Sequence, residues 1–291
     1  STLAELKALS HTYQFSGMPV VEGDDLVGII TNRDIRFEVD FEQPVSRFMT
    51  PKDRLITVNE RASHSEVIDL FRQHRVEKIL IVNDRFHLRG MYTVRDILKS
   101  QENPLATKND SGELRVAAAV GTGPESESRV CALVDAGVDM VVVDTAHGHS
   151  AGGIDRVKWI RQQFPDLGIM AGNVATGEAA LALAEAGANT IKVGIGPGSI
   201  CITRVVAGVG VPQITAIQSV AEALRDKPVS LIADGGVRFS GDVAKAIAAG
   251  AHAVMMGGMF AGTEEAPGDV VLYQGRSYKS YRGMGSIGAM S

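Results

Sequence analysis

The chain has 291 residues, of which 45% are hydrophobic and 22% are charged, a composition typical of a globular protein that can bury a core. Its formal net charge of −5 gives no electrostatic reason to expect a nucleic acid or an anionic membrane surface as a partner. Two cysteines are too few for a disulfide framework, so the expected location is a reducing cytoplasm. No apolar run is long enough for a membrane span and no signal-peptide pattern is present; because the first residue is not Met, we expect the chain to begin inside a longer protein.

The first hundred residues contain an internal repeat, in residues 19–35 (PVVEGDDLVGIITNRDI) and 80–97 (LIVNDRFHLRGMYTVRDI). Each copy predicts a strand, a polar turn, a second strand and a Thr-x-x-Asp step that opens a helix. Thr31 and Asp34 in the first copy match Thr93 and Asp96 in the second. These residues can cap the helix, or they can bind a nucleotide through its phosphate and ribose hydroxyls; the spacing alone favours capping.

The whole repeat resembles a tandem pair of CBS domains over residues 1–104, with the first copy clipped at its N-terminal edge. That resemblance implies a regulatory module that binds purine nucleotides such as ATP or GTP, with Thr31, Asp34, Thr93 and Asp96 at the sites. The polar segment 105–113 is predicted to be a linker, and residues 114–291 are predicted to form the second domain.

Apolar runs alternate with helical patterns after the linker. The predicted strands are 116–120, 140–145, 168–173, 190–195, 229–234 and 253–258, and helical stretches include 129–136, 178–188 and 243–249. Apolar runs without polar alternation suit strands buried on both faces, and the strict order of strand and helix predicts a parallel sheet.

A doubly wound sheet and a barrel both fit this order, but polar residues or glycines follow nearly every strand, which favours a (β/α)₈ barrel with its site at those ends. Only six units can be counted. The predicted fold is therefore α/β, a partial (β/α)₈ TIM barrel with an inserted CBS module, and two further strands are expected before the CBS pair.

The densest group of reactive residues is GIGPGSICITR at 194–204. Its glycines allow a ligand to approach the backbone, and the Ser199 hydroxyl suits a phosphate oxygen. Cys201 lies at a strand end where a thiol can be exposed and activated, which favours a nucleophile over a spectator cysteine. Cys131, inside a helical stretch, is predicted to be a spectator.

Six segments occur in order over residues 114–291: VVVDTAHGHS, AGNVAT, GIGPGSICITR, ADGGVRFSGD, MMGGMFAGTEEAPG and YRGMGSIGAMS. Together they resemble the inosine-5′-monophosphate (IMP) dehydrogenase family. The resemblance implies NAD-dependent oxidation of IMP to xanthosine monophosphate (XMP), the rate-limiting step of guanine nucleotide synthesis. Cys201 attacks C2 of the purine, hydride leaves to NAD, and water hydrolyses the covalent thioimidate.

The resemblance also implies roles for individual residues, and homotetramers or octamers. The catalytic residues are Cys201 and Thr203. The substrate residues are Ser199, Asp234, Gly235, Gly236, Gly257, Gly258, Tyr281, Arg282, Gly283, Met284 and Gly285. The NAD residues are Asp144, Asn173, Gly194, Ile195 and Gly196. Backbone carbonyls of Gly196, Gly198 and Cys201 match a K⁺ site.

Some of these residues also have structural interpretations. Asp234 can cap the following turn, and Asn173 can be a left-handed turn residue. His147 and His149 are predicted to have loop roles. Met255 and Met256 are predicted to pack inside the barrel.

The chain departs from the family at two places. It stops at Ser291, before the mobile flap that carries an Arg for water activation, so this chain alone is expected not to complete turnover. Thr145-Ala146 stand where the family often has Ser, which puts side-chain hydrogen bonds to the cofactor in doubt.

Three other functions compete with this interpretation. GMP reductase shares the cysteine loop, but it usually lacks a CBS pair, so residues 1–104 argue against it. A nucleotide-sensing protein whose barrel only binds, and a flavin-dependent barrel, are the other two.

Overall fold

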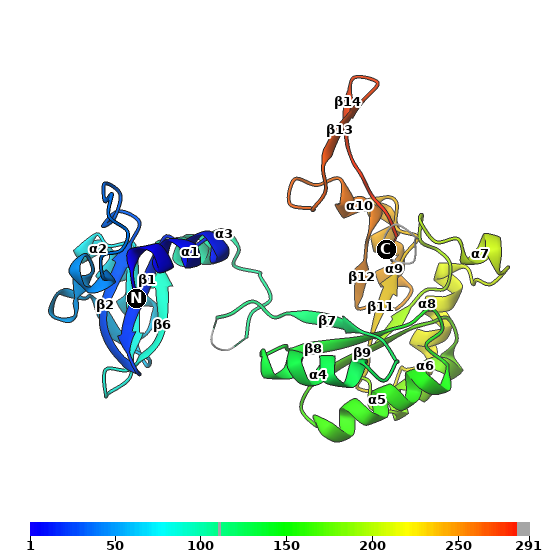
Figure 1. Cartoon of the computed structure of the whole chain (residues 1–291). Coiled ribbons are helices and arrows are strands. Elements are labelled where there is room, and N and C mark those ends of the chain that lie inside the picture. The colour runs from blue at the N-terminus through cyan, green and yellow to red at the C-terminus, as the bar shows by residue number, and fades with distance from the viewer. Residues whose placement is uncertain (110–111, 284–291) are drawn as a thin grey trace. The chain divides into compact units, whose positions relative to one another are not determined.

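The computed structural model describes residues 1–109 and 112–283. The chain divides into two compact units, Ser1–Thr107 and Lys108–Ser291 (Figure 1). Each unit has hydrophobic clusters of its own. Among the described helices, none has the length and apolar character needed to cross a membrane.

The first unit contains two copies of one arrangement, a helix followed by an antiparallel pair of strands. The first copy consists of α1 (Leu3–Tyr13), β1 (Gly17–Glu22), β2 (Asp25–Thr31) and β3 (Thr50–Pro51), with the sheet order β1-β2-β3. The second consists of β4 (Thr57–Asn59), α2 (His64–His74), β5 (Lys78–Val82), β6 (Leu88–Thr93) and α3 (Val94–Glu102), with the order β4-β5-β6. Two short 3₁₀ helices, η1 (Val45–Arg47) and η2 (Lys52–Arg54), flank β3.

The Thr-x-x-Asp step opens a helix in only one copy. Thr93 caps α3, as predicted. After Thr31 the chain forms turns, and the backbone N–H and the hydroxyl of Thr31 both donate to Oδ2 of Asp34 at 2.7 Å. The helix expected there was wrong, because the residues that follow supply no apolar face: Phe37 and Val39 are 91% and 88% exposed.

The second unit is a curled, six-stranded parallel sheet in the order β12-β11-β10-β9-β8-β7, which is part of a (β/α)₈ barrel. Its strands are β7 (Ala117–Val120), β8 (Met140–Asp144), β9 (Gly168–Val174), β10 (Thr190–Val193), β11 (Ser230–Asp234) and β12 (Ala253–Met255). Its helices are α4 (Ser126–Asp135), α5 (Ala151–Gln163), α6 (Gly177–Glu185), α7 (Thr203–Val206), α8 (Gln213–Ala223), α9 (Ser240–Ala248) and α10 (Gly258–Ala261). The α/β class and the partial barrel predicted from the sequence are confirmed.

The core of this unit lies between the sheet and its helices. Ile169, Ile191 and Leu231 of three neighbouring strands are buried with Leu183 of α6 and Ile217 of α8. Because every strand runs in the same direction, the carboxyl ends of all six meet at one edge, and the loops at that edge carry the candidate site.

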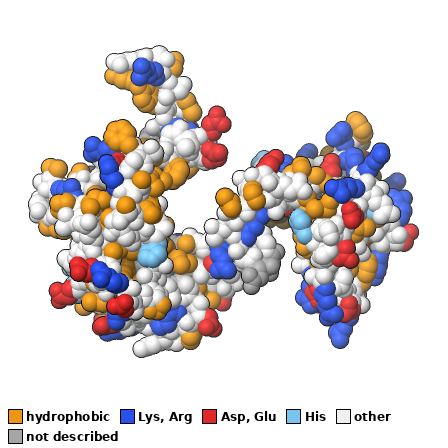
Figure 2. All heavy atoms as spheres, turned by 180° about the vertical axis from the view of Figure 1, so that it is seen from behind, with side chains coloured by type: hydrophobic (Ala, Val, Ile, Leu, Met, Phe, Trp, Pro, Cys, Tyr) orange, Lys and Arg blue, Asp and Glu red, His pale blue; other side chains and the backbone are white. Residues whose placement is uncertain are grey.

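A hairpin that the sequence analysis missed follows α10. It consists of β13 (Val270–Tyr273) and β14 (Arg276–Lys279), which pair antiparallel. Gln274 and Gly275 both have positive φ (48° and 76°), as a two-residue hairpin turn requires. Its apolar side chains are exposed (Figure 2, top), Leu272 to 78%.

Candidate active site

The loop after β10 depends on glycine. Gly194 and Gly196 have φ of +149° and +80°, a region that favours glycine. A Cβ at Gly194 would overlap the carbonyl oxygen of Asp234, and one at Gly196 would lie 2.6 Å from Cγ of Arg204. The loop can therefore lie against β11 and α7 only because these side chains are absent.

Cys201 is exposed at the far end of this loop. Its backbone N–H donates to the carbonyl of Gly198 (3.1 Å), and its thiol lies 3.2 Å from Oγ1 of Thr203, the first residue of α7. The thiol donates to the hydroxyl in this arrangement; if the thiol ionises, the hydroxyl can rotate and donate to the thiolate.

A pocket at the carboxyl edge of the sheet brings together most of the residues predicted for the site. The predicted residues that line it are Asp144, Asn173, Gly194, Gly196, Gly198, Ser199, Cys201, Asp234, Gly235, Gly236, Gly257, Gly258 and Tyr281. They come from loops separated by more than a hundred residues of sequence, so the parallel sheet assembles the pocket.

The remaining predicted residues lie elsewhere. Ile195 accepts a backbone hydrogen bond from Val211, and Thr203 reaches the pocket through Cys201. Arg282 is exposed, and Gly283 lies against Ile200, a lining residue. Met284 and Gly285 lie outside the described residues.

Three glycine-rich loops meet around Ser199. Gly235 (φ +90°) lies against Pro197, where a Cβ would be 3.0 Å from Cγ of the proline. A Cβ at Gly257 would overlap the hydroxyl of Tyr281, and one at Gly258 would lie 3.6 Å from Oγ of Ser199. Hydroxyls and accessible backbone N–H groups at one place are suited to an anion.

A buried lysine in the middle of the site was missed. Lys192, on β10, has a side chain only 4% exposed, and its Nζ donates to Oδ1 of Asp144 and Oδ2 of Asp234, both at 2.9 Å. Burial alone would lower the pKa of Lys192, but the two carboxylates outweigh it and raise the pKa above its usual value. In the sequence, the feature that could have revealed this residue is a single lysine within an otherwise apolar strand.

Two amide side chains join the strand ends. Asn173 Nδ2 donates to the carbonyl of Gly194 (2.9 Å) and to Oδ2 of Asp234 (3.0 Å). Gln213, which was also missed, donates to the carbonyls of Val193 (2.9 Å) and Asp234 (3.1 Å). Asn173 does not have positive φ, and the Asp234 carboxylate pairs with side chains across the sheet. The alternative structural interpretations of both residues were therefore wrong.

The other expectations near the site have mixed outcomes. Met255 was expected to pack inside the barrel, but it is 48% exposed and lines the pocket with Met256, because β12 ends at Met255. His147 is in the loop after β8, outside the pocket lining. The hydroxyl of Thr145 donates to the carbonyl of Gly172 (2.8 Å).

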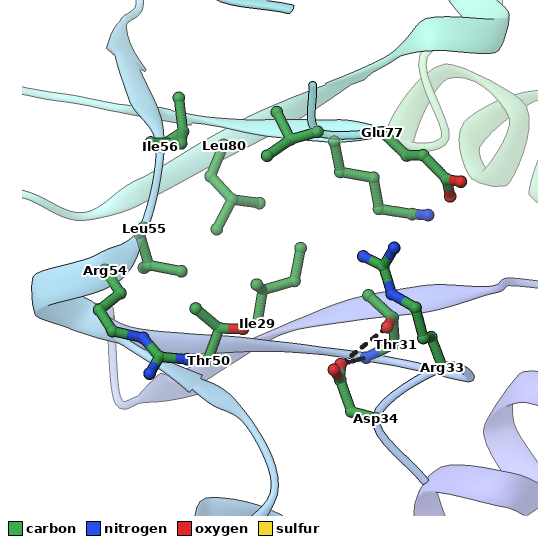
Figure 3. A pocket seen from close by; sticks show the side chains of 12 residues that line it. Ile29, Thr31, Arg33, Asp34, Thr50, Arg54, Leu55, Ile56, Glu77 and Leu80 are labelled. Atoms are coloured by element: carbon green, nitrogen blue, oxygen red, sulfur yellow. Dashed lines mark hydrogen bonds between the residues drawn. The ribbon is translucent and has the colours of Figure 1, made fainter. Parts of the chain in front are cut away.

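The first unit contains a second pocket (Figure 3). Thr31 and Asp34 line it, together with three basic residues that were not predicted, Arg33, Arg54 and Lys78. Its apolar lining consists of Ile29, Leu55, Ile56, Val76 and Leu80. Thr93 and Asp96 do not line this pocket; they form the capping box of α3.

Comparison with known proteins gives two family matches. The model of the IMP dehydrogenase / GMP reductase domain matches residues 33–291, and the CBS domain model matches residues 1–40. Inosine-5′-monophosphate dehydrogenases from Pasteurella multocida and Haemophilus influenzae are each 60% identical over 291 residues. Each of these alignments covers 100% of this chain and 60% of the relative, so the chain spans about 60% of the length of these relatives.

Solved structures of GMP reductase are also similar. The Trypanosoma brucei enzyme in complex with guanosine 5′-monophosphate has a TM-score of 0.84 and 43% identity, covering 94% of this chain and 58% of that one. A complex of the T. brucei enzyme with guanosine 5′-triphosphate has a TM-score of 0.78 and 43% identity, covering 87% of this chain and 61% of that one.

The comparison overturns one argument from the sequence. Residues 1–104 are more than a third of the chain, so a match over 94% of it includes most of them. The N-terminal unit therefore does not argue against GMP reductase, contrary to the expectation. The match over residues 33–291 settles the relationship at the level that both activities share: the chain belongs to the IMP dehydrogenase / GMP reductase family.

Proposed function

We propose that the protein is an IMP dehydrogenase that oxidises IMP to XMP with NAD as the hydride acceptor. The observation that carries this proposal is 60% identity to inosine-5′-monophosphate dehydrogenases across the whole chain, with Cys201 exposed in the pocket. The GMP reductases of similar structure are 43% identical, which favours the dehydrogenase.

The pocket has separate groups for each part of the nucleotide. Ser199 and Tyr281, with the backbone of Gly236, Gly257 and Gly258, bind the phosphate. The free Oδ1 of Asp234 accepts from a ribose hydroxyl.

The purine then lies with C2 facing Cys201. The thiolate sulfur forms a bond to C2, and the hydrogen on C2 leaves as hydride with its electron pair, giving a thioimidate. Water then adds to C2, the S–C2 bond breaks, and XMP and the thiol are released. Thr203 holds the sulfur during these steps through the contact at 3.2 Å.

The residues on the cofactor side fit a nicotinamide. Oδ1 of Asn173 is buried and has no partner among the described residues, so it is an acceptor for the N–H of a carboxamide. Asp144 and the backbone of Gly194, Ile195 and Gly196 complete this side. NAD, when bound, supplies the acceptor for the hydride.

A K⁺ ion fits the cysteine loop on chemical grounds. In the described parts of the chain, no group of three or more His, Cys, Asp or Glu residues could hold a metal ion. The carbonyls of Gly196, Gly198 and Cys201 are instead the proposed ligands, since carbonyl oxygens suit a large hard cation. The Gly198 carbonyl already accepts from Cys201 N–H and keeps a second lone pair for the ion.

A second function is proposed for the first unit, which is the binding of a purine nucleotide such as ATP or GTP that regulates the enzyme. Its support is the pocket in Figure 3, where Asp34 can bind a ribose and the apolar lining can contact a base. Arg33, Arg54 and Lys78 can pair with phosphates. Calorimetry with ATP and GTP tests this proposal, and the absence of binding heat with both nucleotides would contradict it.

A cytoplasmic homotetramer is also proposed from the family resemblance.

Absorbance of NADH is the direct test of the main proposal. Full-length protein mixed with IMP and NAD⁺ is expected to produce NADH. Consumption of NADPH with GMP, and no NADH from IMP, would show a GMP reductase instead. Binding of IMP with neither reaction would favour a nucleotide sensor, and a yellow protein with a flavin spectrum would indicate the third alternative.

A further inference from the structure

Lys192 is the one buried ammonium in the pocket lining of the described residues, and the proposed chemistry gives it no task. Its side chain starts on β10 and reaches Asp234 on the neighbouring β11 and Asp144 on β8, which lies beyond β9. The residue beside it on β9 is Gly172. A Cβ there would lie 2.8 Å from Cβ of Lys192, so glycine leaves the space through which the lysine crosses β9.

The ammonium occupies one oxygen of each carboxylate. Oδ2 of Asp234 accepts from Lys192 and Asn173, and Oδ1 of Asp144 accepts from Lys192. The other oxygen of each carboxylate accepts no hydrogen bond from any residue that the structure describes, although both side chains line the pocket. Each carboxylate is therefore fixed on one side and open on the other.

A buried cluster of charges such as this one contributes little net stability to the fold. Desolvation of an ammonium and a carboxylate commonly offsets their attraction, and a well-packed apolar residue is often as stable. The ammonium does, however, hold two carboxylates of the pocket lining at once, which an apolar residue at this position could not do. The raised pKa of Lys192 keeps it charged across the neutral range.

We propose that Lys192 is a positioning residue that orients Asp234 toward the ribose of a purine nucleotide and Asp144 toward the cofactor. This inference rests on the proposed function of the pocket. Lys192 touches neither the reacting carbon nor the thiol, so its loss weakens ligand binding more than it slows the chemical step.

The test is IMP binding by calorimetry, together with kcat and KM for IMP, with Lys192→Met and Lys192→Arg in the full-length protein. Lys192→Met is expected to weaken IMP binding by about ten- to a hundredfold, as for loss of a hydrogen bond to a charged group. Because Lys192 touches neither the thiol nor the reacting carbon, KM for IMP is expected to rise much more than kcat falls. Lys192→Arg keeps a cation at this position, so it is expected to bind IMP more tightly than Lys192→Met.

Two controls separate positioning from general damage. Lys245→Met removes an exposed lysine that also pairs with a carboxylate, Asp242 at 3.2 Å, and is expected to leave IMP binding unchanged. In an Asp234→Asn background, Lys192→Met is expected to add little, because its effect on IMP passes through Asp234. If Lys192→Met does not fold, Lys192→Gln carries the same expectation.

Three results decide the matter. Wild-type affinity for IMP in Lys192→Met would overturn the inference, and so would a fall in kcat with KM for IMP unchanged. The inference would also be overturned if Lys192→Met weakened IMP binding as strongly in the Asp234→Asn background as it does in the wild-type protein. If the wild-type protein itself does not bind IMP, the proposed function fails, whatever Lys192 does.

Discussion

At the scale of single residues, the proposed chemistry depends on one thiol and its nearest hydroxyl. Cys201 and Thr203 are two residues apart, and the turn that begins at Gly198 brings the sulfur to within 3.2 Å of the hydroxyl. Cys131 is the matched comparison, since it is also exposed but lies on α4, outside the pocket lining.

Cys201→Ser is expected to lower the rate of NADH formation by at least about a thousandfold, because a serine hydroxyl is a far weaker nucleophile than a thiolate. Mass spectrometry of wild-type protein with IMP and NAD⁺ should show an adduct that the variant lacks. Cys131→Ser should retain both the rate and the adduct. A fully active Cys201→Ser protein would exclude covalent catalysis.

The pattern of one segment predicted the centre of the site, the distant site residues were predicted only through the family resemblance, and the contacts across the sheet were not predicted. Ser199, Cys201 and the glycines around them form one contiguous segment. Lys192 and Gln213 act through partners 20 to 48 residues away. Their roles become visible only when the order of the strands is known.

At the scale of elements, helix ends and glycine turns follow local rules. Ser63 accepts from the backbone N–H of Glu66, and the Glu66 carboxylate accepts from Ser63 in return, so the pair caps α2. These hydrogen bonds from the backbone and hydroxyl of Ser63 lower the pKa of Glu66.

A lowered pKa stabilises the fold above the pKa that Glu66 has when unfolded, and this stabilisation is lost as the pH falls through the folded value. Ser63→Ala is expected to destabilise the first unit by about 1 kcal/mol. It should also reduce the acid-range slope of stability against pH. Urea unfolding of the variant at several pH values measures both, with Gln73→Ala, at an exposed position of the same helix, as the control. An unchanged midpoint would contradict the role of the cap.

Gly194→Ala tests the loop between β10 and α7. The new Cβ would overlap the carbonyl of Asp234 at a φ that alanine rarely adopts, so the loop must move away from β11. We expect loss of IMP binding and a lower melting temperature. Gly241→Ala is the control, since a Cβ there would meet nothing within 4 Å. Equal binding by both variants would show that the loop tolerates displacement.

Strand positions were predicted well where an apolar run was unbroken, as in β8, β9 and β11. The predicted end of β12 was three residues too late, because Gly257 and Gly258 lead into α10. The β13–β14 hairpin was not predicted, although a Gln-Gly pair suits its turn, because the residues of β13 are all exposed and show no alternation of apolar and polar positions.

At the scale of the whole molecule, the chain consists of two units with separate cores. The boundary between them falls at Thr107 and Lys108, and the assignment of residues 1–104 to two CBS domains remains a prediction.

A fragment of residues 1–107 is expected to unfold cooperatively in urea and to bind ATP as tightly as the full-length protein, because its pocket is formed by its own residues. If the fragment folded but did not bind ATP, the nucleotide site would not be the pocket of the first unit.

The two pockets differ in the balance of their charges. The acidic and basic side chains that line the barrel pocket are Asp144, Asp234, Lys192 and Arg238, so a dianionic nucleotide meets no net attraction there. The pocket of the first unit has one more cation than anion among Arg33, Arg54, Lys78, Asp34 and Glu77. Since mobile ions screen attraction over about 10 Å at 0.1 M ionic strength, added salt should weaken ATP binding more than IMP binding. If both proposed sites bind as described, the ionic strength of the medium would set how fully the first unit is occupied, while occupancy of the barrel pocket stays nearly constant.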